Sequence, residues 1–126
     1  MATETARPLP PMTPPATVPP AEHLTVLAET FRLLGDPTRL RILYFCLAGP
    51  CAVGTIAASL GLSQALVSHH LRLLRSARLM RAERQARHVF YELADDHVRG
   101  ILVSLAEHVD EVPPAATEKA GPAPAL

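Results

Sequence analysis

Apolar residues recur at helical spacing once the proline-rich start of the chain ends. Between Ala21 and Leu34 they return every three or four positions, which predicts an amphipathic helix. Asp36-Pro37 begins a second helix, because aspartate is a favourable N-cap and proline suits the first helical position. This second helix is apolar around most of its circumference, as in a central core element, and Gly49-Pro50 ends it.

The pattern then predicts two more helices and a hairpin. Val53–Leu60 is expected to be a short helix ended by Gly61, and Ser63 is expected to cap a longer helix that runs to about Ser76. The elements expected after it are strands at Leu79–Ala82 and His88–Leu93, a polar hairpin tip at 83–87 between them, and a last helix from about Asp95 to Glu111. A hairpin directly behind a helix-turn-helix pair predicts a mainly α fold with a β wing, the winged helix-turn-helix.

Proline marks both ends of this ordered part. Residues 8–20 hold seven prolines in thirteen positions, and the chain from Val112 onward is rich in proline and alanine. We therefore expect one small domain at 21–111 between disordered tails at 1–20 and 112–126.

Composition excludes several functional classes. No apolar run approaches the roughly 18 residues that span a bilayer, and the N-terminus lacks the basic head and apolar run of a secretion signal. With two cysteines and no signal, the expected compartment is the reducing cytoplasm. The sequence has no HExxH, GxSxG or phosphate-cradling loop, so we expect no enzyme, no small-molecule substrate and no membrane partner.

The formal net charge of zero hides two oppositely charged segments. Residues 63–88 hold six arginines against one glutamate, a balance of +5, whereas residues 92–111 hold six acidic residues against one arginine, a balance of −5. The basic segment suits an anionic polymer such as DNA, and the acidic helix beside it suits a cation.

The helix that starts after Ser63 has one apolar and one polar side. Its apolar side is expected to face inward through Val67, His70, Leu71 and Leu74. On the other side, short polar residues suit base edges in the major groove of double-stranded DNA, and arginines on the helix and at the hairpin tip suit phosphates or the minor groove. The expected DNA contacts are Ser63, Gln64, Ala65, Ser68, His69, Arg72, Arg75, Arg84 and Arg87. The alternative is that the arginines form a solvated face, and Arg78 and Arg81 lie at linker and strand positions that often serve structure.

Two histidines on the last helix indicate a metal site shared between chains. His97 and His108 are eleven residues apart, so they share one face but lie about 16 Å apart along the axis, too far for one ion. If a second copy of the helix packs antiparallel, Asp95 and His97 of one chain meet His108 and Glu111 of the other. The spacing therefore predicts a symmetric dimer with two four-ligand sites.

The donor set of these sites favours zinc. Two imidazoles and two carboxylates suit tetrahedral Zn(II), and Co(II) is expected to be accepted in vitro. Ni(II) prefers more ligands, and His23, which could supply one, is expected at the start of the first helix. The alternative reading is that both histidines are ordinary surface residues on an acidic helix.

Three segments together resemble the ArsR/SmtB family of bacterial winged-helix, metal-responsive repressors. They are the entry segment 34–43 (LGDPTRLRIL), the recognition-helix segment 62–74 (LSQALVSHHLRLL) and the wing segment 84–91 (RQARHVFY). The resemblance covers about residues 24–111 and implies a homodimer, formed through the N- and C-terminal helices, that occupies an operator and leaves it when metal binds. Asp95, His97, His108 and Glu111 are similar in type and spacing to the family's zinc site between C-terminal helices.

The family's second metal site, built on thiolates, is expected to be vestigial here. Cys51 is similar in position to its cysteine, but the site would need a cysteine at Val53 or an acid at Gly54. Cys46 falls on the core helix and is expected to be a small buried hydrophobe, which disfavours arsenic, cadmium or lead sensing through sulfur. A Cys46–Cys51 redox pair is the alternative.

The resemblance also implies a mechanism. Zinc fixes the tautomer of His108, whose other ring nitrogen then donates to a backbone carbonyl, around Arg78 in this chain, near the junction of recognition helix and wing. The dimer is thereby locked in a geometry whose recognition helices no longer fit successive major grooves. A winged-helix regulator without metal sensing, and a Ni(II) or Co(II) sensor that uses the same helix, remain open alternatives.

Overall fold

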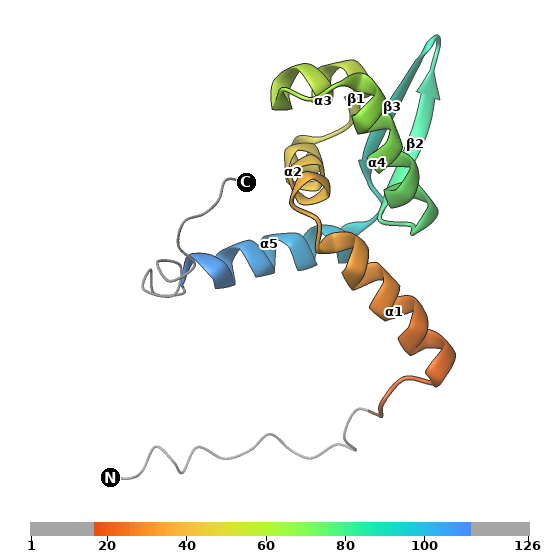
Figure 1. Ribbon diagram of the computed structural model, residues 1–126, viewed down its shortest axis with the longest axis vertical. Coiled ribbons are helices and arrows are strands. Elements are labelled where there is room, and N and C mark those ends of the chain that lie inside the picture. The colour runs from red at the N-terminus through yellow and green to blue at the C-terminus, as the bar shows by residue number, and fades with distance from the viewer. Residues whose placement is uncertain (1–16, 112–126) are drawn as a thin grey trace.

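The computed structural model describes residues 17–111, so the tails expected at 1–20 and 112–126 lie outside the described residues except for 17–20. Most of this part is helical, and a small antiparallel sheet carries the wing (Figure 1). In chain order the elements are α1 (Ala21–Leu34), α2 (Pro37–Phe45), the 3₁₀ turn η2 (Cys46–Ala48), β1 (Cys51–Ala52), α3 (Val53–Leu60), α4 (Gln64–Ser76), β2 (Met80–Gln85), β3 (His88–Leu93) and α5 (Asp96–Asp110). The predicted winged helix-turn-helix is confirmed, with α3 and α4 as the helix pair and β2 and β3 as the wing.

Side-chain caps fix where three helices begin. Asp36, Ser63 and Asp95 precede α2, α4 and α5, and each side-chain oxygen accepts a hydrogen bond from the backbone amide three residues on, at 2.9, 3.1 and 3.0 Å. Each cap satisfies one of the amides that a helix start leaves without a partner. Gly61 follows α3 at φ 71°, a left-handed conformation that glycine adopts without strain. Gly61 ends α3 and Ser63 begins α4, so the turn between the two helices is only three residues long.

The first strand of the wing begins one residue later than the sequence predicts and is longer. β2 runs to Gln85, which pairs with His88, so a two-residue turn at Ala86-Arg87 replaces the expected five-residue tip. The last residues of β2 are exposed on both faces, so no alternation of apolar and polar residues was available to mark them as a strand. The sequence also gave no sign of β1, whose two residues pair with β3 and give the sheet the order β1-β3-β2.

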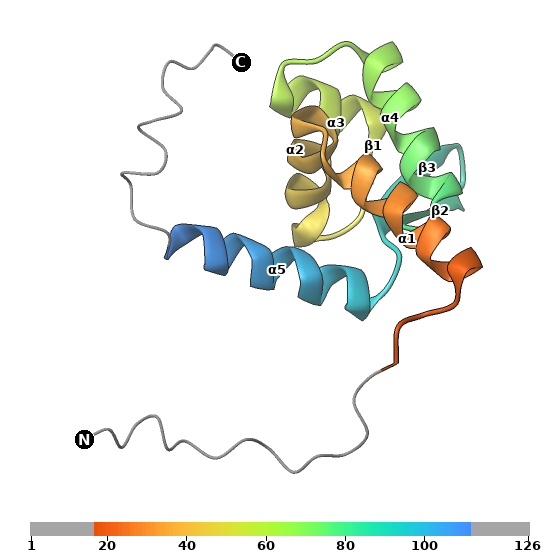
Figure 2. The same cartoon turned by 60° about the horizontal axis from the view of Figure 1, so that its bottom comes forward.

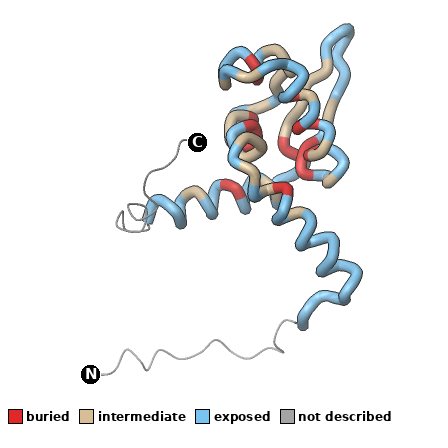
Figure 3. The backbone as a smooth tube through the Cα atoms, viewed as in Figure 1, coloured by how far each residue is buried: buried red, intermediate tan, exposed pale blue. Residues whose placement is uncertain are grey.

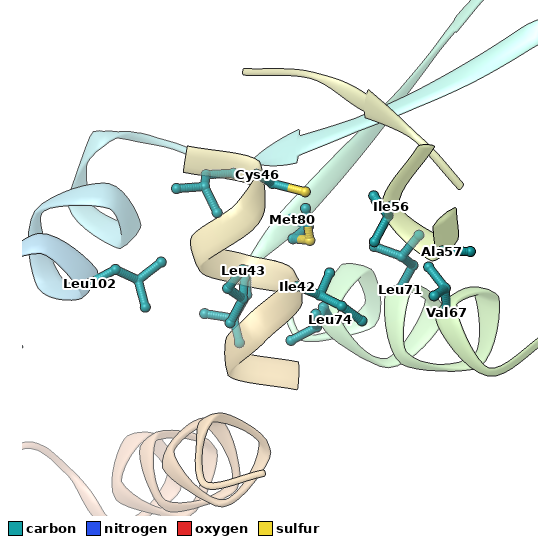
Figure 4. Close-up of a cluster of buried hydrophobic side chains, with 12 residues drawn as sticks. Ile42, Leu43, Cys46, Ile56, Ala57, Val67, Leu71, Leu74, Met80 and Leu102 are labelled. Carbon is teal, nitrogen blue, oxygen red and sulfur yellow. The ribbon is translucent and has the colours of Figure 1, made fainter. Parts of the chain in front are cut away.

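The core lies between α2, α3, α4 and the base of the sheet, with side chains of α2 at its centre (Figure 4). Its buried members are Ile42, Leu43, Cys46, Ile56, Ala57, Val67, Leu71, Leu74, Leu79, Met80, Leu93 and Leu102. Leu102 alone comes from α5. The core therefore supports the helix pair and the wing far more than the last helix.

Helices α1 and α5 extend from this core and are exposed over most of their surface (Figures 2 and 3). Each buries a single residue, Leu33 in α1 and Leu102 in α5. Eight of the ten large hydrophobic side chains that are exposed in the described residues belong to these two helices: Leu24, Val26, Leu27, Phe31, Ile101, Val103, Leu105 and Val109. One chain thus leaves an apolar surface that runs over both helices.

Candidate nucleic-acid interface and candidate metal centre

The candidate recognition helix is α4, and its inner face is the predicted one. Val67, His70, Leu71 and Leu74 are its buried residues, as the spacing predicts. On the outer face Gln64, Arg72 and Arg75 are exposed and Ser68 is half-buried; Ser63, Ala65 and His69 are also exposed. The helix therefore offers a row of polar and basic side chains to a groove, while its apolar stripe holds it on the core.

Two predicted contacts are partly engaged within the chain. The Ser63 hydroxyl oxygen accepts the capping hydrogen bond of α4, so its own proton stays available to a DNA acceptor. The Gln64 amide leans toward Gly54 on α3, where an added Cβ would lie 3.7 Å from Nε2. The start of α4 is thus positioned by α3, as the reading of base edges requires.

His70 is held at the corner between α1 and α2. Its Nδ1 lies 3.3 Å from Arg39 Nη1, and the Arg39 Nε donates to the carbonyl of Leu33 at 2.9 Å. A guanidinium has only donors, so Nδ1 is the acceptor and the ring is neutral in this contact. Burial lowers the pKa of His70, Arg39 and His69 lower it further, and Asp36 opposes them. This contact ties α4 to the end of α1.

The wing adds two arginines to the basic face. Arg84 lies near the end of β2 and Arg87 in the turn, both exposed. Arg81 instead pairs across the hairpin with Glu92, with Nε 2.9 Å from Oε2, a structural role that suits its strand position. Among the described residues, Arg72, Arg75, Arg84 and Arg87 form no ion pair with one another or with an acid, so their charge is available to phosphates.

The four predicted metal ligands lie at the two ends of α5. Asp95 and His97 mark its start, with Asp95 Oδ1 3.8 Å from His97 Nδ1, and His108 and Glu111 mark its end. All four are exposed. In the described part of one chain, no three histidine, cysteine or acidic side chains come close enough to hold a metal ion. One chain therefore holds two candidate half-sites, each with one imidazole and one carboxylate.

The capping hydrogen bond at the start of α5 leaves lone pairs of Asp95 free for a metal ion in the first candidate half-site. Asp95 Oδ1 is occupied by the amide of Val98, but a carboxylate has a second oxygen and several lone pairs. The side chain of His97 is 95% exposed, so its ring can turn toward a partner. Asp96 is the first residue of α5, where its charge favours the positive end of the helix dipole. The donors present fit the tetrahedral nitrogen and oxygen sites that zinc accepts.

Two side chains that fasten α5 were not foreseen. The Tyr44 hydroxyl donates to the carbonyl of Leu102 at 2.7 Å, and Arg99 Nη1 donates to the carbonyl of Leu47 at 2.8 Å. A tyrosine on the core helix was the available signal, because a half-buried hydroxyl needs a partner. The sequence does not reveal the hydrogen-bond acceptor, which lies 58 residues further along the chain.

The cysteines do not form a thiolate cluster. Cys46 is fully buried, and burial together with nearby Cys51 raises its pKa to about 12, so the predicted buried hydrophobe is confirmed. Cys51 is half-buried at the start of β1, with its sulfur 3.5 Å from the carbonyl of Gly49. Both are free thiols.

Membrane insertion finds no support in the helices. Within residues 17–111, none has the length and apolar character needed to span a bilayer.

Comparison with known proteins identifies the family. Residues 36–81 match the model of bacterial regulatory proteins of the arsR family. The chain is 43% identical over 99 residues to the HTH-type transcriptional regulator CmtR of Mycobacterium tuberculosis, a match that covers 76% of this chain and 84% of CmtR. It is 41% identical over 85 residues to a transcriptional repressor SmtB homolog of Synechocystis, covering 68% of this chain and 64% of that protein, slightly under two thirds of its length.

Solved structures agree with these relatives. The homodimeric winged helix-turn-helix domain of a possible ArsR-family regulator from Mycobacterium bovis superimposes with a TM-score of 0.71 at 26% identity, over 79% of this chain and 92% of that one. The solution structure of apo-NmtR gives a TM-score of 0.65 at 30% identity, over 83% and 88%. With its helix pair, its wing and relatives that regulate transcription, this chain belongs to the arsR family of bacterial regulatory proteins and is a DNA-binding regulator, not an enzyme.

Proposed function

We propose that this chain is a metal-responsive repressor that binds operator DNA as a metal-free homodimer and is released when Zn(II) bridges the α5 helices of the two chains. One observation carries the proposal: two complementary half-sites lie at opposite ends of one exposed helix. Neither half can hold an ion alone, and an antiparallel pair of α5 helices completes both.

The apolar surface over α1 and α5 supports the homodimer. Four large exposed hydrophobic side chains on each helix are more than an isolated small domain usually leaves in water. The related domain from Mycobacterium bovis is homodimeric. A second copy on this surface would cover both helices and place two α4 helices for two half-sites on DNA.

The arginines on α4 and on the wing support operator binding. They are exposed and free of acidic partners in the described chain, whereas the acidic residues gather on α5. In this arrangement the bases are read by Gln64 and Ser68, and the phosphates by Arg72, Arg75, Arg84 and Arg87.

The proposed release uses the end of α4. Arg78, two residues after the end of α4, has φ 62°, and its amide donates to the carbonyl of Arg75. A proton on the second nitrogen of zinc-bound His108 would reach a carbonyl near this junction in the partner chain and fix the dimer in a geometry that no longer fits DNA. Because linkage is reciprocal, operator DNA must weaken zinc binding by the same factor, on the order of 100-fold for a working switch.

Fluorescence anisotropy on the region upstream of the chain's own gene tests this function, with and without Zn(II), Co(II), Ni(II) and Cd(II). We expect Zn(II) and Co(II) to release the wild type. His108→Ala should bind the operator as tightly as wild type and ignore zinc, while His23→Ala should still respond. Loss of metal-free operator affinity in His108→Ala would contradict the separation of the two roles.

Two other outcomes select the alternatives. A response to Ni(II) that His23→Ala removes would favour a site with more ligands, and the absence of any metal response would favour a regulator without metal sensing. Titration with Co(II) adds an independent measurement, because one tetrahedral Co(II) per chain is expected from the four-ligand sites.

A further inference from the structure

Helix α5 is fastened to its own chain mainly over its first two turns, where Val98 packs half-buried against the core and Leu102 is buried in it. Leu102 is 1% exposed and packs into the core, where Figure 4 shows its side chain directed toward Leu43 on α2. Two hydrogen bonds join the same stretch to α2 and η2: Tyr44 to the carbonyl of Leu102, and Arg99 to the carbonyl of Leu47. Beyond the Asp95 cap, the rest of α5 is exposed or half-buried.

Within this attachment, the contact at Leu102 lies midway between the two proposed half-sites. Leu102 is five residues after His97 and six before His108, or about 7.5 and 9 Å along the helix axis. The arm that carries His97 is joined through Ala94 and Asp95 to the buried end of β3, whereas the arm that carries His108 is mostly exposed. A metal ion bound at His108 would therefore act on the freer arm and turn α5 about the contact at Leu102.

The partner of this attachment leads directly to the DNA-reading helices. Tyr44 lies on α2, whose neighbours Ile42 and Leu43 are fully buried in the core that α3 and α4 share. Protein cores are close-packed, so a displacement of α2 is passed to its neighbours and not absorbed. The hydrogen bond from the Tyr44 hydroxyl joins α5 directly to α2, so it restrains how α5 turns and slides against that helix.

We propose that Tyr44 is a positioning residue for the metal response: its hydrogen bond to Leu102 makes the middle of α5 a pivot that carries metal-driven reorientation of α5 into α2 and the helix-turn-helix. The inference rests on the proposed function. The proposed function already includes a contact between chains at the end of α4, and the pivot adds a second coupling path that lies within one chain. The inference assigns Tyr44 no contact with metal or DNA.

Tyr44→Phe tests the pivot, because it keeps the ring and removes only the hydroxyl. The matched control is Tyr91→Phe, since Tyr91 is half-buried against the same core and its hydroxyl has no hydrogen bond within the described residues. Operator affinity is measured by anisotropy with and without Zn(II), and zinc affinity by competition with a chromophoric chelator. Thermal unfolding of both variants checks that they fold.

We expect Tyr44→Phe to keep metal-free operator affinity and zinc affinity within about twofold of wild type. The loss of operator affinity caused by zinc should shrink at least tenfold, a change of coupling of about 1.4 kcal/mol. Tyr91→Phe should retain the wild-type response. Arg99→Ala should weaken the response in the same direction, and it replaces Tyr44→Phe if that variant does not fold.

The outcomes separate the two proposals. If wild type itself ignores zinc, the proposed function fails. If wild type responds and Tyr44→Phe responds equally, or if neither Tyr44→Phe nor Arg99→Ala reduces the response, the pivot is wrong while the function stands. A variant that loses metal-free operator affinity to the same extent as its zinc response would show a merely structural role and also overturn the inference.

Discussion

Helices α4 and α5 are both amphipathic and of similar length, yet one chain buries them to very different extents. Four of the 13 residues of α4 are buried, against one of the 15 residues of α5. The apolar side of α4 meets α2 and α3 of its own chain, whereas Ile101, Val103, Leu105 and Val109 on α5 stay exposed. The proposed recognition helix is complete in one chain, and the helix that carries the proposed metal half-sites is not.

The difference indicates that folding of one chain is enough to position α4, whereas α5 depends on further contacts. The position of α4 is determined when the chain folds, because its stripe belongs to the core. The position of α5 is set by the buried Leu102, the half-buried Val98, two hydrogen bonds and the contacts that cover its apolar side. A helix held so loosely by its own chain is suited to respond to a ligand that a second copy helps to bind.

The largest effect is expected from Leu71→Ala, which truncates a fully buried side chain of α4. Loss of burial and the cavity left behind should lower the free energy of unfolding by about 3 kcal/mol. Urea unfolding followed by circular dichroism measures it. Leu66→Ala on the same helix is the control, because Leu66 is 39% exposed and its truncation should cost less than about 1 kcal/mol. Equal losses in the two variants would contradict the burial difference.

Leu105→Glu should have the next largest effect, and on assembly instead of folding. Leu105 is 46% exposed on α5, so one chain tolerates a charge there, but an apolar surface shared by two chains does not. We expect a folded monomer by sedimentation and a loss of operator affinity of about 100-fold, since a single α4 reads only one half-site. Ala48→Glu, exposed on η2, should remain dimeric. A Leu105→Glu variant that is still dimeric would place the interface elsewhere.

A smaller effect is expected from pH, through His70. Its folded pKa is lowered by burial, so the unfolded chain binds this proton more readily. Stability is then fully present above the ordinary histidine pKa of about 6.5 and is lost as pH falls below it toward the folded value. Urea midpoints at pH 7.5 and 5.5 measure the loss, which His70→Gln should reduce. His88→Gln on the exposed wing is the control and should leave the wild-type loss in place; equal losses in all three proteins would remove His70 as the cause.

The sequence predicted those features that depend on local pattern. Three such features follow from spacing and residue type: the apolar stripe of α4, the caps at Asp36 and Ser63, and the turn at Gly61. They can be predicted because each depends on residues close together in the sequence. β1 and the end of β2 were not predicted. The two residues of β1 are too few to show an alternating pattern, and the exposed end of β2 has no apolar face to mark it as a strand. The bond from Tyr44 to Leu102 is tertiary, and a hydroxyl does not reveal its acceptor in advance.

The candidate metal centre shows a different limit. Spacing alone places Asp95 and His97 one helix length from His108 and Glu111, and the structure of one chain keeps them there. In the proposed site a second chain completes the ligand set, so the geometry of the site would depend on how two chains pack. For this reason the metal site stays a prediction, whereas the fold is confirmed.

The smallest effect is expected from Ala86→Gly, in the turn that closes the wing. Ala86 has φ 60°, a region that costs a residue with a Cβ about 1–2 kcal/mol. Glycine removes that strain but loses about 0.5–1 kcal/mol more conformational entropy on folding, so the net gain in the free energy of unfolding should be about 0.5–1 kcal/mol. Thermal unfolding measures the gain. Ala82→Gly is the control, because Ala82 lies within β2 at ordinary negative φ, where glycine should destabilise by up to about 1 kcal/mol. Operator affinity should not change in Ala86→Gly, since Arg84 and Arg87 keep their places on either side of it. A stabilised wing that binds operator more weakly would show that the strained turn itself presents the arginines to DNA. The wing would then resemble α5, because its geometry would serve a binding partner and not the stability of its own chain.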